Sequence, residues 1–152
     1  PEDCEKFPSL VEYHLSPKIT EGAGAELVRN GIYGACMDIS DGLSSELNHL
    51  ALSSGVSLEI EEEMLPIDPE VLRMCSHYGL DPLEFAMNGG EEYQLLFANS
   101  SPKIIFEKDN HRMNRVCRVG SALKGGSDGI HVYMRCCNGE SKLVDARAWS
   151  HL

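Results

Sequence analysis

Two spacings of apolar residues alternate along this chain, and together they predict a mixture of helices and strands. Within residues 43–54 the apolar side chains recur every three or four positions, and Gly55 follows where a left-handed residue ends a helix at little cost. The run 33–37 is short, mostly apolar and interrupted by glycine, which is typical of a buried strand. Alternation over 56–60 is typical of a strand with one buried face. A strand, a helix and a second strand are therefore expected in succession.

Capping and turn signals predict the remaining elements. Asp68-Pro69 and Asp81-Pro82 each place a capping carboxylate before a first-turn proline, so each is expected to open a short helix. A further helix is expected at 19–30, and the remaining strands are expected at 93–98, 115–119, 130–135 and 142–144, with a glycine-rich loop at 125–129. Because helices and strands mix without strict alternation, we expect an α/β (α+β) domain in which helices pack on a mixed β-sheet.

Composition narrows the class of protein. A chain of 152 residues with 42% hydrophobic residues can bury the core of one domain. No stretch approaches the ~18 apolar residues of a membrane span, and the sequence shows no charged and then apolar leader, so we expect a cytoplasmic protein. The net charge of -11 argues against nucleic acid or an anionic membrane as a partner, because both are bound mainly by Lys and Arg. A nucleotide would need a cation to bind here.

The six cysteines favour reduced structural thiols over a disulfide framework or a zinc site. They include no C-x-x-C pair, and the one close pair, Cys136-Cys137, would point to opposite faces of a strand. Zinc needs clustered Cys and His ligands, which this spacing does not provide.

The segment Asp38-Ile39-Ser40-Asp41-Gly42 carries two carboxylates and a hydroxyl between the predicted strand and the helix that follows. Open α/β sheets bind ligands at this end of their strands, and the free amides of a helix start favour anions. Carboxylates alone would repel a phosphate, but Mg²⁺ accepts both kinds of oxygen ligand. Ordinary helix capping by Ser40 or Asp41 also explains these residues and is the simpler interpretation from this turn alone, so both interpretations stay open.

Two further motifs lie downstream. Residues 88–97 read Asn-Gly-Gly-Glu-Glu-Tyr-Gln-Leu-Leu-Phe, which places two glycines and two carboxylates before an apolar strand. By itself this pattern also fits a simple strand-entry turn. Near the end, Ala148-Trp149-Ser150-His151 contains the single tryptophan, which suits either packing of a tail or stacking on a cationic heterocycle.

Taken together, these three motifs resemble the carboxyl-terminal half of thiamine-monophosphate kinases, members of the aminoimidazole ribonucleotide synthetase superfamily. The resemblance runs from about Tyr13 to His151, and the Asp-x-Ser-Asp-Gly pattern is its most specific part. It implies that residues 1–152 form a single carboxyl-terminal domain with a ferredoxin-like element. It also implies that the amino-terminal domain, which binds ATP and Mg²⁺, is absent, and that the parent enzyme is a homodimer held mainly through that absent domain.

The resemblance further implies an ATP-dependent and Mg²⁺-dependent transfer of phosphate to thiamine monophosphate, giving thiamine diphosphate. Asp38 and Asp41 would be the metal ligands and the catalytic residues, and Ser40 would contact the ATP phosphates. Glu91 and Trp149 would bind the substrate. The acceptor is itself a phosphate, with a second pKa near ~6, so no protein base is required. We expect this half of the enzyme to fold alone but not to catalyse the reaction alone.

Four positions depart from the family pattern, and they keep two other interpretations open. Glu92 stands for an Asp and Gln94 for a Glu, while Ser150 replaces an Asp and Leu152 a Phe. One alternative is another ATP-using synthetase of the superfamily, although its motif at the Asp38 turn should differ. The other is a non-catalytic binding module that keeps the fold.

Overall fold

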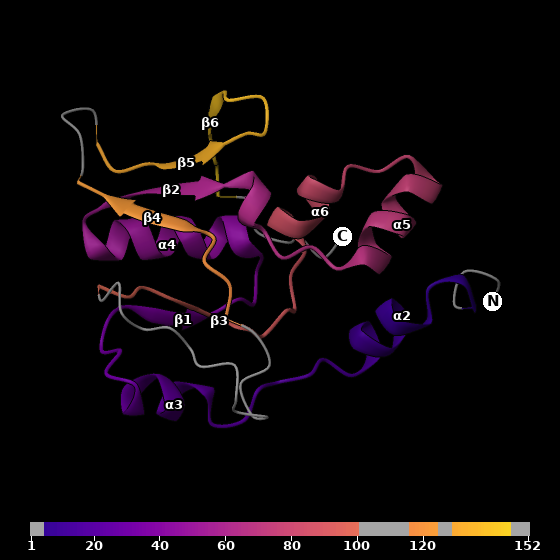
Figure 1. Cartoon of the computed structure of the whole chain (residues 1–152), viewed down its shortest axis with the longest axis horizontal. Helices are drawn as coiled ribbons and strands as arrows, with labels where there is room; N and C mark the ends of the chain where they lie inside the picture. The colour runs from indigo at the N-terminus through magenta and orange to yellow at the C-terminus, as the bar shows by residue number, and fades with distance from the viewer. Residues whose placement is uncertain (1–4, 101–115, 125–128, 147–152) are drawn as a thin grey trace.

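The computed structural model describes residues 5–100, 116–124 and 129–146 (Figure 1). Over these residues, four strands form a sheet in the order β4-β2-β5-β6, and β1 pairs with β3 separately. The helices are α2 (Pro8–Leu15), α3 (Ala23–Arg29), α4 (Leu43–Ser54), α5 (Pro69–Tyr78) and α6 (Pro82–Asn88), with a short 3-10 helix η1 (Glu62–Met64). The strands are β1 (Cys36–Asp38), β2 (Ser57–Glu61), β3 (Leu95–Phe97), β4 (Gly120–Leu123), β5 (Val132–Arg135) and β6 (Ser141–Leu143).

The larger sheet is mixed, as the sequence predicted. Strand β2 runs antiparallel to β4 and parallel to β5, and β5 runs antiparallel to β6. The parallel register places Leu58 opposite Val132 and Ile60 opposite Met134. All four side chains are buried, so this register brings the apolar face of β2 and that of β5 to the same side.

Helix α4 lies between the four-stranded sheet and the β1–β3 pair (Figure 1). Its inner side chains Leu47 and Ala51 are each 1% exposed and belong to one cluster with residues of β2, β3 and β5. Met87 of α6 joins the same cluster. Because α4 is packed from both sides, its first turn and the residues before it are held in a defined position.

Several predicted boundaries were wrong, for local reasons. The helix expected at 19–30 begins only at Ala23, because Gly22 has a φ of 77° that a right-handed helix does not admit. The strand expected at 33–37 is Cys36–Asp38, and Cys36 and Asp38 are exposed rather than buried. Residues 116–119, the described part of the strand expected at 115–119, are not in a strand, and pairing with β2 begins at Gly120.

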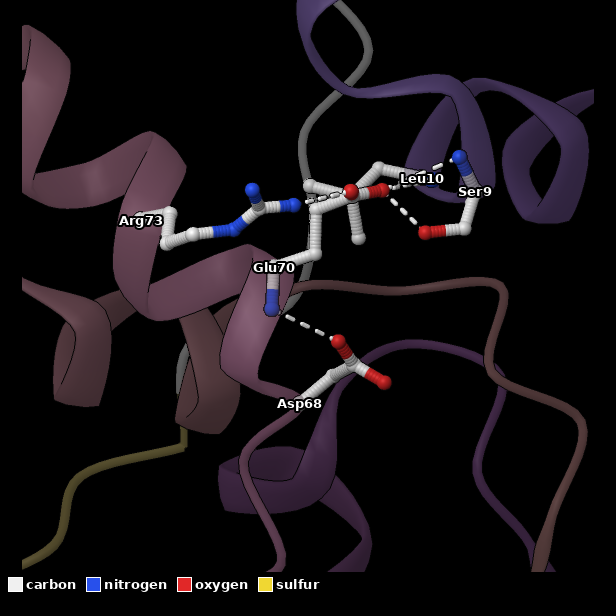
Figure 2. A network of polar contacts seen from close by, with 5 residues as sticks. All are labelled: Ser9, Leu10, Asp68, Glu70 and Arg73. Atoms are coloured by element: carbon white, nitrogen blue, oxygen red, sulfur yellow. Dashed lines mark hydrogen bonds and ion pairs between the residues drawn. The ribbon is translucent and has the colours of Figure 1, made fainter.

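The structure also contains a helix that the sequence patterns did not predict, α2, whose start is capped by a side chain of α5 (Figure 2). The Glu70 carboxylate accepts hydrogen bonds from the main-chain N–H groups of Ser9 (2.9 Å) and Leu10 (3.1 Å) and from the Ser9 hydroxyl, and it pairs with Arg73. Asp68 in turn caps α5 by accepting from the Glu70 N–H at 2.7 Å, as predicted. One network therefore fixes the starts of two helices.

Over the same described ranges, none of the helices has the length and apolar character needed to cross a bilayer.

Candidate functional site

The structure places Asp38, Ser40 and Asp41 together between β1 and α4, on what we call the 38–42 turn. Asp38 is the last residue of β1, and Gly42 is the residue just before α4. Gly42 has a φ of 118°, and a Cβ atom there would lie 3.1 Å from the carbonyl carbon of Asn88. A glycine is therefore required both by the backbone conformation and by the close approach of α6.

Main-chain hydrogen bonds join the 38–42 turn to residues 88–94, which we call the glycine-glutamate segment. The Ile39 N–H donates to the Gln94 carbonyl at 2.9 Å, and the Tyr93 N–H donates back to the Ile39 carbonyl at 2.8 Å. The Glu91 N–H donates to the Ser40 carbonyl, also at 2.8 Å. These bonds continue the pairing of β1 with β3, so the two motifs, about fifty positions apart in the sequence, meet at one end of that strand pair.

The start of α4 is not capped by Ser40 or Asp41, the two residues that the sequence offered as caps. The N-cap residue of α4 is Gly42, which offers no side-chain cap, and neither Ser40 nor Asp41 caps the helix with its side chain. Instead the main-chain N–H of Asp41 donates to Oε1 of Glu46, at 3.1 Å. Both Asp38 and Asp41 are exposed, and their carboxylates form no hydrogen bond or ion pair with another described residue. They are therefore available to a ligand.

Glu46 is a residue of this site that the motif search did not single out. It is only 3% exposed, and its Oε2 atom has no hydrogen-bond partner within the described part of the chain. The signal in the sequence is an acidic residue in the first turn of the predicted helix 43–54, which is usually a modest contribution to helix stability. Burial of this carboxylate could not be inferred from that signal.

The residues present fit a cation that is shared with a phosphate. Among residues 5–100, 116–124 and 129–146, no three His, Cys, Asp or Glu side chains come together as a complete metal site. Mg²⁺ commonly takes only one or two protein carboxylates and completes its shell with water and substrate phosphate. Asp38 and Asp41 suit that role, and the buried carboxylate of Glu46 contacts the Asp41 main chain through its Oε1 atom while its Oε2 atom has no partner among the described residues.

The glycine-glutamate segment has a strained backbone. Glu91 and Tyr93 have φ values of 65° and 54°, which are uncommon for residues other than glycine. Gly89 is also constrained, since a Cβ there would lie 2.7 Å from the carbonyl oxygen of Phe85. The hydroxyl of Ser44 donates to Oδ1 of Asn88 at 2.7 Å and so ties α4 to the start of this segment. Strain of this kind persists only where surrounding contacts hold it, and it is frequent at binding sites.

Side-chain contacts from the amino-terminal part of the chain hold the other end of the segment. Nε2 of Gln94 donates to the Tyr13 hydroxyl (3.1 Å) and to the Lys18 carbonyl (3.0 Å). The Tyr13 hydroxyl donates to the Glu92 carbonyl, also at 3.1 Å. Burial raises the pKa of Tyr13, and desolvation raises the pKa of Glu92. The Gln94 departure therefore has a structural use, because an amide donates to the Lys18 carbonyl where a glutamate carboxylate would not.

The remaining predicted substrate residue, Trp149, lies outside the described residues, as do Ser150 and Leu152. Its role stays a prediction. Of the predicted site residues, the structure thus brings together Asp38, Ser40, Asp41 and Glu91.

Comparison with known proteins identifies relatives of this chain, although no protein-family model matches it. The thiamine-monophosphate kinase of Aquifex aeolicus is 37% identical over 153 residues, which cover 99% of this chain and 44% of that protein. The thiamine-monophosphate kinase of Pyrococcus abyssi is 38% identical over 149 residues, which cover 97% of this chain and 43% of that protein. The chain thus spans less than half the length of these curated relatives.

Solved structures agree with the sequence comparison. A structure of AaThiL complexed with AMPPCP and TMP matches 95% of this chain and 41% of its own, with 36% identity and a TM-score of 0.66. A hydrogenase maturation protein, HypE, in complex with ATP matches 78% of this chain with 23% identity and a TM-score of 0.57, so it shares the fold. The mixed-sheet fold expected from the resemblance is confirmed by these neighbours.

Proposed function

This chain is related along 99% of its length to thiamine-monophosphate kinases, and from that relationship we propose that it forms the carboxyl-terminal domain of such an enzyme. The reaction is the transfer of the γ-phosphoryl group of ATP to thiamine monophosphate, which gives thiamine diphosphate. Relatives that bear this name are 31% to 38% identical to the chain, and one solved structure that resembles it is complexed with AMPPCP and TMP. Because the chain corresponds to about 44% of the Aquifex aeolicus protein, the activity belongs to a longer polypeptide.

The observation that carries the proposal is the contact between the two motifs. The Ser40 carbonyl accepts the Glu91 N–H at 2.8 Å, so the carboxylates of the 38–42 turn and the glutamate assigned to the substrate lie at one site. A phosphoryl-transfer enzyme must bring a metal-bound nucleotide and its acceptor together, and its catalysis depends mostly on positioning and charge neutralisation. This arrangement suits both requirements.

We assign to each residue the role that the resemblance to these kinases implies. Asp38 and Asp41 hold Mg²⁺, which when bound neutralises the charge on the transferred phosphate. Ser40 contacts the ATP phosphates beside the start of α4, whose free amides favour anions. Glu91 and Trp149 bind thiamine monophosphate. No side chain needs to act as a base, because the phosphate acceptor is already largely dianionic at neutral pH.

The same assignment predicts the cell compartment in which the enzyme works and its oligomeric state. The five described cysteines are free thiols, which suits the reducing conditions of the cytoplasm, where we expect the enzyme to work. We also expect the parent enzyme to be a homodimer, with most of its interface outside this chain.

We expect replacement of a turn carboxylate to abolish activity without unfolding the protein. In the full-length protein that contains this chain, Asp41→Asn should lower kcat for thiamine diphosphate formation about 100-fold or more, because one metal ligand loses its charge. Product is measured by chromatography after incubation with ATP, Mg²⁺ and thiamine monophosphate.

The matched control is Asp145→Asn, which removes the same charge from an exposed position that is not among the predicted site residues and should leave kcat unchanged. A folded wild-type protein that forms no thiamine diphosphate would overturn the kinase assignment. Binding of thiamine monophosphate without turnover would then favour the non-catalytic module, and ATP hydrolysis without such binding would favour another synthetase of the superfamily.

A further inference from the structure

We propose that Glu46 is a positioning residue of the 38–42 turn, which fixes the main chain of Asp41 and strengthens cation binding there through its buried carboxylate. The identity of the cation, Mg²⁺, rests on the proposed function, but the role of Glu46 does not depend on which phosphate acceptor the enzyme uses.

Glu46 contacts the main chain of Asp41 directly. Oε1 of Glu46 accepts the Asp41 N–H at 3.1 Å, from the first turn of α4 back to the residue before Gly42. The carbonyl of the neighbouring residue Ser40 accepts the Glu91 N–H, at 2.8 Å. Two hydrogen bonds thus hold the main chain of the turn, and Glu46 supplies the one at Asp41 itself.

The carboxylate of Glu46 is buried without a counter-charge among the described residues. Glu46 is 3% exposed, its Oε2 atom has no partner within the described residues, and none of the described ion pairs includes it. Burying a carboxylate without a counter-charge is strongly unfavourable in proteins. The free amides at the start of α4 offset part of that cost. A divalent cation held by the adjacent Asp41 would offset more of it, and by reciprocity Glu46 would strengthen cation binding.

The variant Glu46→Gln separates a role of Glu46 in cation binding from a role as a helix cap only. A glutamine at position 46 keeps an oxygen that can accept the Asp41 N–H, so it preserves a cap, but it removes the negative charge. The two roles therefore predict different results for Glu46→Gln. If Glu46 is only a cap, Glu46→Gln leaves the cation affinity unchanged. If Glu46 also supplies charge to the site, Glu46→Gln weakens cation binding.

The experiment measures binding of Mn²⁺ alone, used as a paramagnetic probe in place of Mg²⁺, to the full-length protein that contains this chain. Free Mn²⁺ is followed by electron paramagnetic resonance. We expect Glu46→Gln to raise the Kd for Mn²⁺ about 10-fold, as is usual when a residue that orients a metal ligand is changed. The matched control is Glu63→Gln, which removes the same charge from an exposed position and should leave the Kd unchanged.

Thermal unfolding without metal is measured on both variants. An unchanged Kd in a folded Glu46→Gln variant would overturn the proposal, whether or not the melting temperature falls. If that variant does not fold, the wild-type protein still tests the proposal. Bound Mn²⁺ should then broaden the NMR signals of the Asp41 and Glu46 amides at a lower Mn²⁺ concentration than it broadens the signal of the Glu63 amide. Absence of this selective broadening would also overturn it.

The same data distinguish this proposal from the proposed function. Mn²⁺ binding that depends on Glu46 in a protein that makes no thiamine diphosphate would support the role of Glu46 and refute the kinase assignment. If the Glu46→Gln variant forms thiamine diphosphate and binds Mn²⁺ as tightly as the wild type, the kinase assignment is supported and the role of Glu46 is refuted.

Discussion

At the scale of single residues, Gly42 decides whether the 38–42 turn can form. Its φ of 118° and ψ of 146° lie in a region that is essentially reserved for glycine. A Cβ there would also lie 3.1 to 3.2 Å from main-chain atoms of Asn88, which cannot move as a flexible side chain would. The turn therefore depends on this glycine for conformation and for packing against α6.

We expect Gly42→Ala to lower the free energy of unfolding by about 2 to 4 kcal/mol, from backbone strain and the clash with Asn88. Gly139→Ala is the matched control, because Gly139 has a positive φ of 84° but no atom within 4 Å of a Cβ at that position. It should cost only about 1 to 2 kcal/mol, the usual penalty of a left-handed conformation. Chemical denaturation measures the free energy of unfolding of both variants. Equal losses would show that the clash with Asn88 does not destabilise Gly42→Ala.

At the scale of elements, α2 depends on a carboxylate from another helix. Its own N-cap residue, Phe7, offers no side-chain acceptor, and Glu70 of α5 supplies one instead (Figure 2). The hydrogen bond from the Ser9 hydroxyl is the main reason that the pKa of Glu70 is lowered, with smaller contributions from the Ser9 and Leu10 N–H groups and from Arg73. The start of α2 is thus coupled to the protonation of Glu70.

This coupling predicts a pH dependence with a definite sign. A carboxyl group whose pKa is lower in the folded state stabilises the fold above its ordinary pKa of 4.5, and that contribution is lost as the pH falls through the lowered folded-state pKa. We therefore expect Glu70→Gln to be less stable than the wild type at pH 7, with a difference that shrinks below pH 4.5.

The measurement is urea denaturation over this pH range. Glu63→Gln, at an exposed position, serves as the control and should follow the wild type at every pH. A constant difference between Glu70→Gln and the wild type from pH 7 to acid would show that Glu70 acts by packing alone. Amide hydrogen exchange of Ser9 and Leu10 should be faster in Glu70→Gln, because their acceptor is weakened.

At the scale of the whole molecule, the chain has a core of its own, and on the proposed function it supplies only part of the catalytic site. The buried cluster runs without a break through α4, α6, β2, β3 and β5. The described residues, by contrast, contain no group of three His, Cys, Asp or Glu side chains that could hold a metal by themselves. The chain corresponds to less than half of its curated relatives, so residues that complete the site are expected outside it.

We expect the isolated chain of 152 residues to unfold cooperatively yet to form no thiamine diphosphate. Urea denaturation followed by circular dichroism tests the first expectation, and chromatography after incubation with ATP, Mg²⁺ and thiamine monophosphate tests the second. The full-length protein is the positive control for turnover. Product from the isolated chain would show that its own residues suffice for phosphoryl transfer.

The sequence by itself determined those features that depend on neighbours along the chain. Asp68 caps α5 and Asp81 caps α6 as predicted, because an aspartate before a first-turn proline needs only the next two residues. Helix α4 ends at Gly55 for the same kind of reason, with a left-handed φ of 67°. The position of the 38–42 turn between a strand and a helix was likewise predicted, since the residues that form it are consecutive.

Only the tertiary structure decided what depends on residues far apart. Helix α2 has no cap of its own, and its acceptor Glu70 lies about sixty positions downstream. The contact between Ser40 and Glu91 requires β1 to pair with β3, and the burial of Glu46 requires α4 to be covered from both sides. Local patterns report short-range steric and hydrogen-bonding preferences, whereas pairing and burial follow from packing of the whole chain, which no short segment encodes.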